Sequence, residues 1–415
     1  MKKLIITGLT MCCVAGFISG WHGQRPVAAD ERKPVKWAPA VEPKELVGSA
    51  KLGLTWLAEH QNKDGGWGQG EEANNMRNSQ AHENVAYQSN VADTCVACLA
   101  MLRSGSSPTR GEYSRNLQDG IAYVCSQVEG SDNDSLSVTN VKGTRVQGKL
   151  GPYIDTFMAS LMLAEAKGQM ADDKSEKRLL LALDKVIHKI EKNQKADGTY
   201  SNEGWAPVLA QSMATKGLNR AVQNGATVSE VTLRKSEDYA RYDAPSGGFA
   251  KAGAGNAGVD LYSTSASLTN MQDSINTNAA REQELKDKVR DAKTEGERQD
   301  AQTTLTNFEK TKEAQGQARK AVVGRLEDKA FISGFGSNGG EEFLSYMNIS
   351  ESLVATGGKE WEKWDTSMTE NLSRIQNPDG SWSGHHCITG RTFCTASAIL
   401  VLTADRAPVP LAIRK

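Results

Sequence analysis

Hydrophobic and polar positions form two kinds of helical segment along this chain. In one kind, apolar residues recur every three or four positions among charged ones, which is the pattern of a helix with one buried face. In the other kind, apolar and small residues occupy almost every position, as in residues 93–102, 155–164, 262–268, 343–353 and 393–400. Such helices must be buried on most sides, so the alternation predicts an inner and an outer layer of helices. Strand patterns are sparse, and the fold is predicted to be all-α.

A repeated motif marks the ends of three of the outer helices. In each copy a glutamine is followed three residues later by Asp-Gly and then by an aromatic residue. Asp-Gly suits a turn with positive φ, and the aromatic ring can fold back over the helix end. About six helical hairpins follow from these copies and their degenerate relatives, which is enough to close into a ring. The three copies are Gln61–Trp67, Gln194–Tyr200 and Gln376–Trp382.

A charged segment breaks the repeat at residues 281–328. Nearly half of its residues are charged, the two signs are interleaved, and Phe308 is its single aromatic residue. Interleaved charges are typical of a solvated helical surface. We therefore expect a coiled-coil-like helical insertion that projects from the ring as a mobile arm and contributes little to the core. The alternative is an arm that binds a protein partner.

The start of the chain has the order of a signal peptide. Lys2 and Lys3 precede an apolar run at residues 4–17, and small residues follow. The protein is therefore expected to be exported, to the periplasm or the medium. No later run reaches the ~18 apolar residues that a membrane span needs, so none is expected after cleavage. The expected divisions are a signal peptide and cleavage region at 1–29, a flexible proline-containing N-terminus at 30–44, the helical ring at 45–405 and a C-terminal tail at 406–415.

Composition and charge narrow the classes of partner. Lysine and arginine number 49 and aspartate and glutamate 50, so the net charge of -1 leaves no basic excess with which to bind nucleic acid. The hydrophobic fraction of 38% is that of an ordinary folded protein. Five cysteines remain beyond residue 29, which permits one disulfide, for example Cys95 with Cys394, or a metal site.

The glutamine–tryptophan units resemble the QW motif of the terpenoid cyclase and protein prenyltransferase superfamily. The chain looks most like the exported prenyltransferase/squalene oxidase repeat proteins of that superfamily. This resemblance covers residues 45–405 without the insertion, and it implies an α/α toroid, a ring of inner helices within a ring of outer ones. Neither 132–134 nor 172–173 makes the D-x-D-D acid motif of squalene cyclases, which disfavours carbocation cyclisation.

The same resemblance implies a partly altered zinc site. Asp93-Thr94-Cys95 is similar to the D-x-C element with which prenyltransferase β-subunits bind zinc. The family's histidine lies near the start of the last inner helix, whereas the two histidines here precede that helix on a loop. Taken alone, the aspartate also suits a helix N-cap and the cysteines suit packing. The candidate zinc ligands are Asp93, Cys95, His385, His386 and Cys394.

The resemblance also implies a cavity mouth. In a toroid, the loops that lead into the inner helices surround the entrance to the central cavity. Several residues with reactive or ligand-binding side chains fall on these segments. They are His82, Asp155, Glu203, Tyr262, Glu341, Glu342, Cys387 and Arg391.

Two functions are consistent with these residues. The first is a non-catalytic exported toroid that binds an apolar, peptide or glycan ligand in its central cavity. The second is a zinc-dependent toroid enzyme of transferase or lyase type. The sequence leaves both open. We assign four tryptophans to packing between repeats and not to ligand contact: Trp56, Trp67, Trp205 and Trp382.

Overall fold

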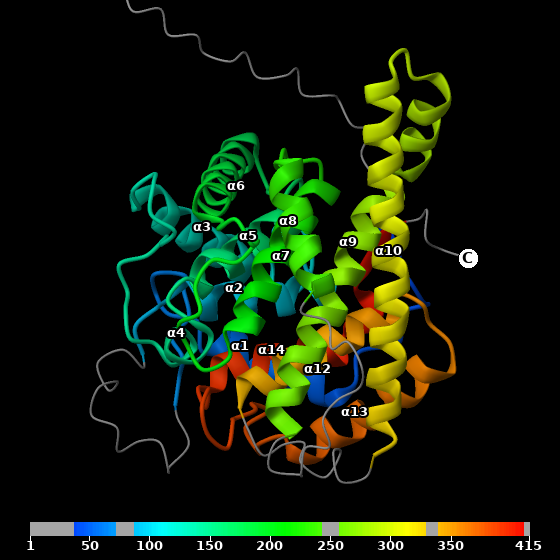
Figure 1. Ribbon diagram of the computed structural model, residues 1–415. Coiled ribbons are helices and arrows are strands. Elements are labelled where there is room, and N and C mark those ends of the chain that lie inside the picture. The colour runs from blue at the N-terminus through cyan, green and yellow to red at the C-terminus, as the bar shows by residue number, and fades with distance from the viewer. Residues whose placement is uncertain (1–36, 72–86, 243–256, 329–338, 411–415) are drawn as a thin grey trace, which may run out of the picture. The chain divides into compact units, whose positions relative to one another are not determined.

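Helices make up nearly all the regular structure of the computed structural model, which describes residues 37–71, 87–242, 257–328 and 339–410 (Figure 1). The prediction of an all-α fold is confirmed. One short antiparallel strand pair, β1 (Trp37–Pro39) with β2 (Pro408–Pro410), joins the two ends of the described chain. Within these ranges, no helix has the length and apolar character that crossing a membrane requires. The candidate residue His82 lies outside the described residues.

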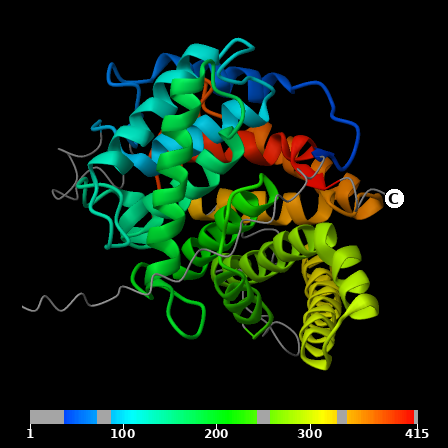
Figure 2. The same cartoon turned by 90° about the horizontal axis from the view of Figure 1, so that it is seen from above.

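Six helices contact one another in order around a closed ring. Each packs against the next along the chain, and the last contacts the first (Figure 2). This is the arrangement of inner helices that the sequence pattern predicts. The inner helices are α2 (Val91–Arg103), α5 (Ile154–Ala166), α7 (Pro207–Gln223), α9 (Ala257–Asp291), α12 (Gly340–Val354) and α14 (Arg391–Leu402).

The other long helices pack on the outside of this ring. They are α1 (Gly48–Glu59), α3 (Ser114–Gly130), α6 (Asp173–Asn193), α8 (Glu230–Tyr242), α10 (Glu295–Leu326) and α13 (Lys359–Ile375), and the short α4 (Arg145–Leu150) precedes α5. Here α3 contacts α2, α6 contacts α5, α8 and α10 contact α9, α13 contacts α12, and α1 contacts α14. These helices are amphipathic: α6, for example, buries Leu179, Leu183, Val186 and Ile190 at helical spacing and leaves most of its charged residues, Lys189 excepted, partly or fully exposed.

The repeated glutamine motif links neighbouring outer helices. At the end of α13, Nε2 of Gln376 donates to the carbonyl oxygen of Gly380 at 2.7 Å and to that of Ser49 in α1 at 2.8 Å. Gln61 and Gln194 donate in the same way to their own turn glycines and to carbonyl oxygens of α3 and α8. The prediction that the three motifs occupy corresponding outer-helix ends is confirmed. We call each such arrangement a staple.

The turn glycine of each staple lies against the next outer helix. Gly380 has φ of 89°, and a Cβ atom there would stand 2.9 Å from the carbonyl oxygen of Leu52. Both the left-handed backbone and the close approach exclude a larger residue. The aromatic residue of the motif is then buried, and Nε1 of Trp382 donates to the carbonyl oxygen of Leu372 at 2.8 Å.

The charged segment 281–328 differs from its prediction. The end of α9 and all of α10 form a hairpin, in which Leu285, Ala301 and Phe308 make a small separate core. Farther along α10, Ala318 and Val322 belong to the main hydrophobic core. The expectation of a solvated arm is therefore wrong for this half of the segment, which is an outer helix of the ring. The buried positions 301, 308, 311, 315, 318 and 322 have coiled-coil spacing. Thr311 and Gln315 are polar, so the sequence shows no continuous apolar stripe at these positions.

Candidate functional site

Hydrogen bonds hold the starts of four inner helices together. The backbone N–H of Thr392 in α14 donates to the carbonyl oxygen of Gln69, which lies between α1 and α2 in the chain. The N–H of Gly340, at the start of α12, donates to the carbonyl oxygen of Ile388 at 2.8 Å. Oδ1 of Asp155 in α5 accepts from the N–H of Ala92 in α2 at 3.0 Å. The candidate residues on these four starts therefore lie at one end of the ring, which we call the mouth.

Asp155 has a structural role at the mouth. Its second oxygen, Oδ2, accepts from Nε2 of Gln147 at 2.8 Å, so the carboxylate joins α4, α5 and the start of α2. The side chain is buried, and burial raises its pKa while the bonds from Gln147 and Ala92 lower it. Asp155 therefore connects its own helix to the start of the neighbouring helix α2.

Asp93 is buried beside the N-cap of α2. The cap itself is Asn90, whose side chain accepts from the N–H of Asp93 at 2.9 Å and donates to Oδ2 of Asp93 at 2.7 Å. The N-cap interpretation of Asp93 is therefore wrong. Its Oδ1 is buried without a hydrogen-bond partner in the described part of the chain. Burial raises the pKa of Asp93 to about 7, and the bond from Asn90 offsets only part of this effect.

Replacing Asp93 with asparagine should stabilise the protein in a pH-dependent way. The folded carboxyl has a pKa of about 7 against an ordinary value of 3.8, so folding favours its protonated form between these values. Stability from this group therefore falls as the pH rises from 4 to 7, and the asparagine variant lacks this dependence. We expect Asp93→Asn to raise the free energy of unfolding by about 2 kcal/mol at pH 8 and by much less at pH 4. Urea denaturation at both pH values measures the difference, and equal effects at both would contradict the assignment.

Glu341, Cys387 and Tyr262 form a second buried group at the mouth. Oε2 of Glu341 accepts from the N–H of Ile388 at 3.2 Å, and burial raises the pKa of this carboxyl. Cys387 has φ of 67°, a positive value that no other non-glycine residue in the described ranges has, and such strain is common at functional sites. Burial and the Glu341 charge raise the pKa of the Cys387 thiol to about 11, so it is neither a thiolate nor an activated nucleophile at neutral pH. Burial, with Glu341 close by, also raises the pKa of Tyr262.

Trp205 is an exposed aromatic residue next to this group. Its side chain is 68% exposed, whereas Trp67 and Trp382 are fully buried. Nζ of Lys149 lies 5.7 Å from the centre of the Trp205 ring, and the same lysine interacts with the Cys387 thiol. The assignment of Trp205 to repeat packing is therefore wrong, while that of Trp56, Trp67 and Trp382 agrees with their burial. We define the mouth cluster as Lys149, Trp205, Tyr262, Glu341 and Cys387.

The sequence contained a signal that could have identified Trp205. The second copy of the motif already has Tyr200 at its aromatic position, so Trp205 occupies no position of the repeated motif. Tyr200 is buried and packs against Phe157, with ring centres 5.1 Å apart. Lys149 carries no comparable signal, because it reaches the cluster only through the fold of α4.

The remaining mouth candidates lie around the cluster. Arg391, at the start of α14, forms ion pairs with Asp379 and with Glu71, the latter at 3.3 Å. Glu342 is buried, and its Oε1 accepts from the hydroxyl of Tyr346 at 2.6 Å. Glu203 is exposed on the loop before α7.

The zinc ligands implied by the resemblance do not fit a metal site as the structure places them. Cys95 interacts electrostatically with Cys125 of α3 and Asp155 of α5, whereas Cys394 lies near Glu341 and Asp93. Asp93 and Cys95 are two residues apart on a regular helix, about 200° around its axis, so they point in different directions. His385 and His386 lie on the loop before α14, with their Nδ1 atoms 3.4 Å apart. The described ranges contain no group of three or more metal-ligating side chains that could hold an ion.

The suggested disulfide is also absent where it was expected. All five cysteines of the described ranges, Cys95 and Cys394 among them, carry free thiols. Sγ of Cys394 donates instead to the carbonyl oxygen of Ile388 at 3.3 Å. Both cysteines are fully buried, which agrees with the packing interpretation.

Buried ion pairs occupy the ring at the other end of the inner helices. Glu351 of α12 contacts Arg103 of α2 at 2.8 Å and Lys216 of α7 at 2.7 Å. Arg103 also contacts Glu165 of α5, and Lys216 contacts Asp273 of α9 at 3.0 Å. Arg103 is ten residues beyond Asp93 on the same helix, so this network lies roughly 15 Å from the mouth. The expected central cavity is therefore filled with charged side chains at this level.

Comparisons with known proteins add little to this picture. No family model and no curated protein matches the chain. Among solved structures, a chain described as a novel alpha-amylase from Clostridium perfringens is similar, with 10% sequence identity and a TM-score of 0.46. The similarity covers 88% of this chain and 100% of that chain. A likeness this distant carries no argument about the activity of this protein.

Proposed function

We propose that the protein is an exported toroid of the prenyltransferase/squalene-cyclase-like kind that binds a glycan at its mouth cluster. The observation that carries this proposal is the exposed ring of Trp205, which Lys149 connects to Cys387 and, through Cys387, to the buried carboxyl of Glu341. A flat aromatic surface packs against the apolar face of a sugar ring, and carboxylate oxygens accept hydrogen bonds from its hydroxyl groups. Small-molecule sites combine aromatic surfaces with a few polar groups in this way.

The polar interior of the ring favours a hydroxylated ligand over an apolar one. The buried faces of α9 and α12 are rich in serine, threonine and asparagine. Several buried oxygens have no hydrogen-bond partner in the described ranges, and such groups normally bind water or a ligand. An isoprenoid chain could not satisfy them. They include Oγ1 of Thr264, Oγ of Ser267, Oδ1 of Asn270 and Oδ1 of Asn348.

Titration calorimetry with soluble oligosaccharides tests the proposal. We expect at least one of maltohexaose, cellohexaose, xylohexaose and chitohexaose to bind the mature protein. Trp205→Ala should weaken that binding tenfold or more, because the stacking surface is lost. Leu181→Ala, which removes an exposed side chain from α6 in the outer layer, is the matched control and should bind as the wild type does.

Two results would count against a glycan ligand. One is the absence of binding to all four sugars. The other is equal affinity of the wild type and Trp205→Ala, which would place any glycan site elsewhere on the protein. Circular dichroism of both variants shows whether the fold is retained.

A further inference from the structure

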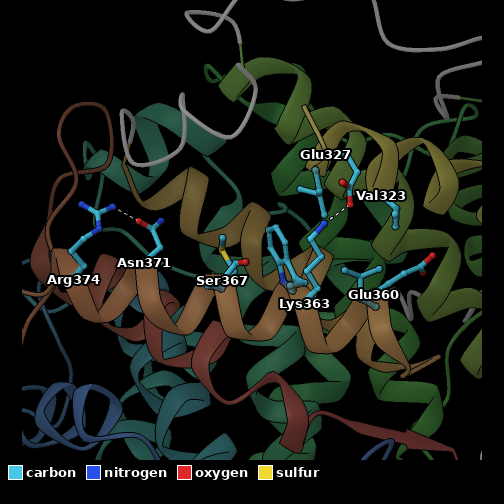
Figure 3. Close-up of a pocket in the computed structure, with 11 residues that line it drawn as sticks. Val323, Glu327, Glu360, Lys363, Ser367, Asn371 and Arg374 are labelled. Carbon is cyan, nitrogen blue, oxygen red and sulfur yellow. Dashed lines mark hydrogen bonds and ion pairs between the residues drawn. The ribbon is translucent and has the colours of Figure 1, made fainter. Parts of the chain in front are cut away.

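A cavity of about 390 Å³ lies between the outer helices α10 and α13 and shares no residue with the mouth cluster (Figure 3). Its floor is apolar and consists of Leu353 from α12 with Trp364 and Met368 from α13. Val323 and Leu326 of α10 form the facing wall. The volume lies within the range of small-molecule sites, ~300–1,000 Å³.

The cavity is long and narrow because it follows one face of α13. Its lining residues on this helix fall on one face and are Glu360, Lys363, Trp364, Ser367, Met368, Asn371 and Arg374. Fourteen residues of helix separate the first from the last, which corresponds to roughly 21 Å. A trough of this shape suits an extended chain better than a compact ring system.

Most charges on the rim of the trough are paired across it. Glu360 of α13 pairs with Arg319 of α10 at 2.6 Å, and Lys363 of α13 pairs with Glu327, the C-cap residue of α10. These pairs connect the two helices, and Figure 3 shows the second of them, between Lys363 and Glu327.

Arg374 is the exception, at one end of the trough. Its guanidinium donates to Oδ1 of Asn371 at 2.5 Å, as Figure 3 shows, and no carboxylate of the described chain forms a salt bridge with it. The trough therefore carries one uncompensated positive charge at this end. Guanidinium groups bind carboxylates with two parallel hydrogen bonds, so Arg374 is suited to an acidic head group.

We infer that this trough binds a linear fatty acid, independently of the proposed glycan site. The acyl chain lies along Leu353, Trp364 and Met368, and the carboxylate meets Arg374. Apolar contact then sets the affinity, which should rise about fourfold with each methylene group that becomes buried, since one buried CH₂ contributes the equivalent of that factor. The positive charge selects an acid over the matching alcohol.

Calorimetry with decanoate, laurate and dodecanol, below their micelle concentrations, tests this inference. Laurate should bind the wild type at least tenfold more tightly than decanoate. Arg374→Gln should weaken laurate binding tenfold or more and leave dodecanol binding unchanged. Arg115→Gln, at an exposed arginine of α3 paired with Asp119, is the matched control and should change neither.

A second variant tests the place of binding. Ser367 is exposed and lines the trough, so Ser367→Trp should fill it without disturbing the core, and laurate binding should be lost. Retention of laurate binding by Ser367→Trp, or absence of laurate binding to the wild type, would overturn the inference. An equal loss of dodecanol binding in Arg374→Gln would overturn the assignment of the carboxylate to Arg374. Thermal unfolding of each variant confirms that it is folded.

Discussion

Replacing Glu351 with glutamine should lower the free energy of unfolding by about 3–5 kcal/mol. The carboxylate lies between Arg103 and Lys216, which are almost completely buried, and it compensates both charges. Burial alone would raise the pKa of Glu351, but the surrounding Lys216 and Arg103 charges lower it well below its usual range. The neutral amide leaves these cations buried with too little negative charge. Removing one partner of a buried ion pair is strongly destabilising because the remaining charge is uncompensated.

Urea denaturation at pH 7, followed by circular dichroism, measures this effect. Glu129→Gln is the matched control, because Glu129 pairs with Arg178 at 2.7 Å on the surface, where both side chains are more than one-third exposed. That substitution should change the free energy of unfolding by less than about 1 kcal/mol. Similar losses of unfolding free energy in the two variants would show that the buried Glu351 network contributes no more to stability than a surface ion pair.

The pH dependence of the Glu351 effect has a defined sign. The folded pKa is below the ordinary value of 4.5, so the ionised carboxylate stabilises the fold above pH 4.5. This contribution is lost as the pH falls below 4.5 toward the folded pKa. The difference between the wild type and Glu351→Gln should therefore be constant near neutral pH and shrink in acid.

Replacing Trp382 with alanine should lower the free energy of unfolding by about 3–5 kcal/mol. The indole is fully buried, and its Nε1 donates to the carbonyl oxygen of Leu372 at 2.8 Å. Alanine would leave a cavity and an unsatisfied carbonyl between α13, α1 and α14. Thermal and urea denaturation measure the loss.

Trp205→Ala is the matched control for Trp382→Ala, because the same substitution is made at a mostly exposed ring. It should change the free energy of unfolding by less than about 0.5 kcal/mol, as surface substitutions usually do. A large loss at Trp205, or a small one at Trp382, would contradict the separation of binding and packing tryptophans. The Trp205 variant also serves the glycan test, so one protein answers both questions.

The two helix layers and the staples of this fold could be predicted because each depends on residues that are close together in the sequence. The amphipathic spacing of α6 requires a buried face, and Gln376 with Asp379 and Gly380 specifies a helix end and its turn. The buried stripe of α10 was not predicted, because Thr311 and Gln315 interrupt its apolar positions. Periodicity alone does not identify a stripe whose polar members find partners only in the folded protein.

The candidate site was harder to predict than the fold. Residue types pointed to Glu341, Cys387 and Tyr262 because these residues lie at or just before the starts of buried helices, and such starts lie at the ends of the ring. Residue types alone do not fix the direction of a ligand: Asp93 and Cys95 are close in sequence but lie about 200° apart around the axis of α2. Lys149 entered the cluster only through the position of α4, which no local pattern specifies.

The staple from Gln376 to Ser49 and the pairing of β1 with β2 give this ring no terminal repeat. An open array of helical repeats exposes an apolar face at each end and needs a capping repeat to cover it. Here the first and last hairpins cap each other, so breaking that single joint would uncover two apolar faces at once. Because the first and last hairpins cover each other, neither can unfold alone without exposing the other. The ring is therefore expected to unfold cooperatively and not one repeat at a time.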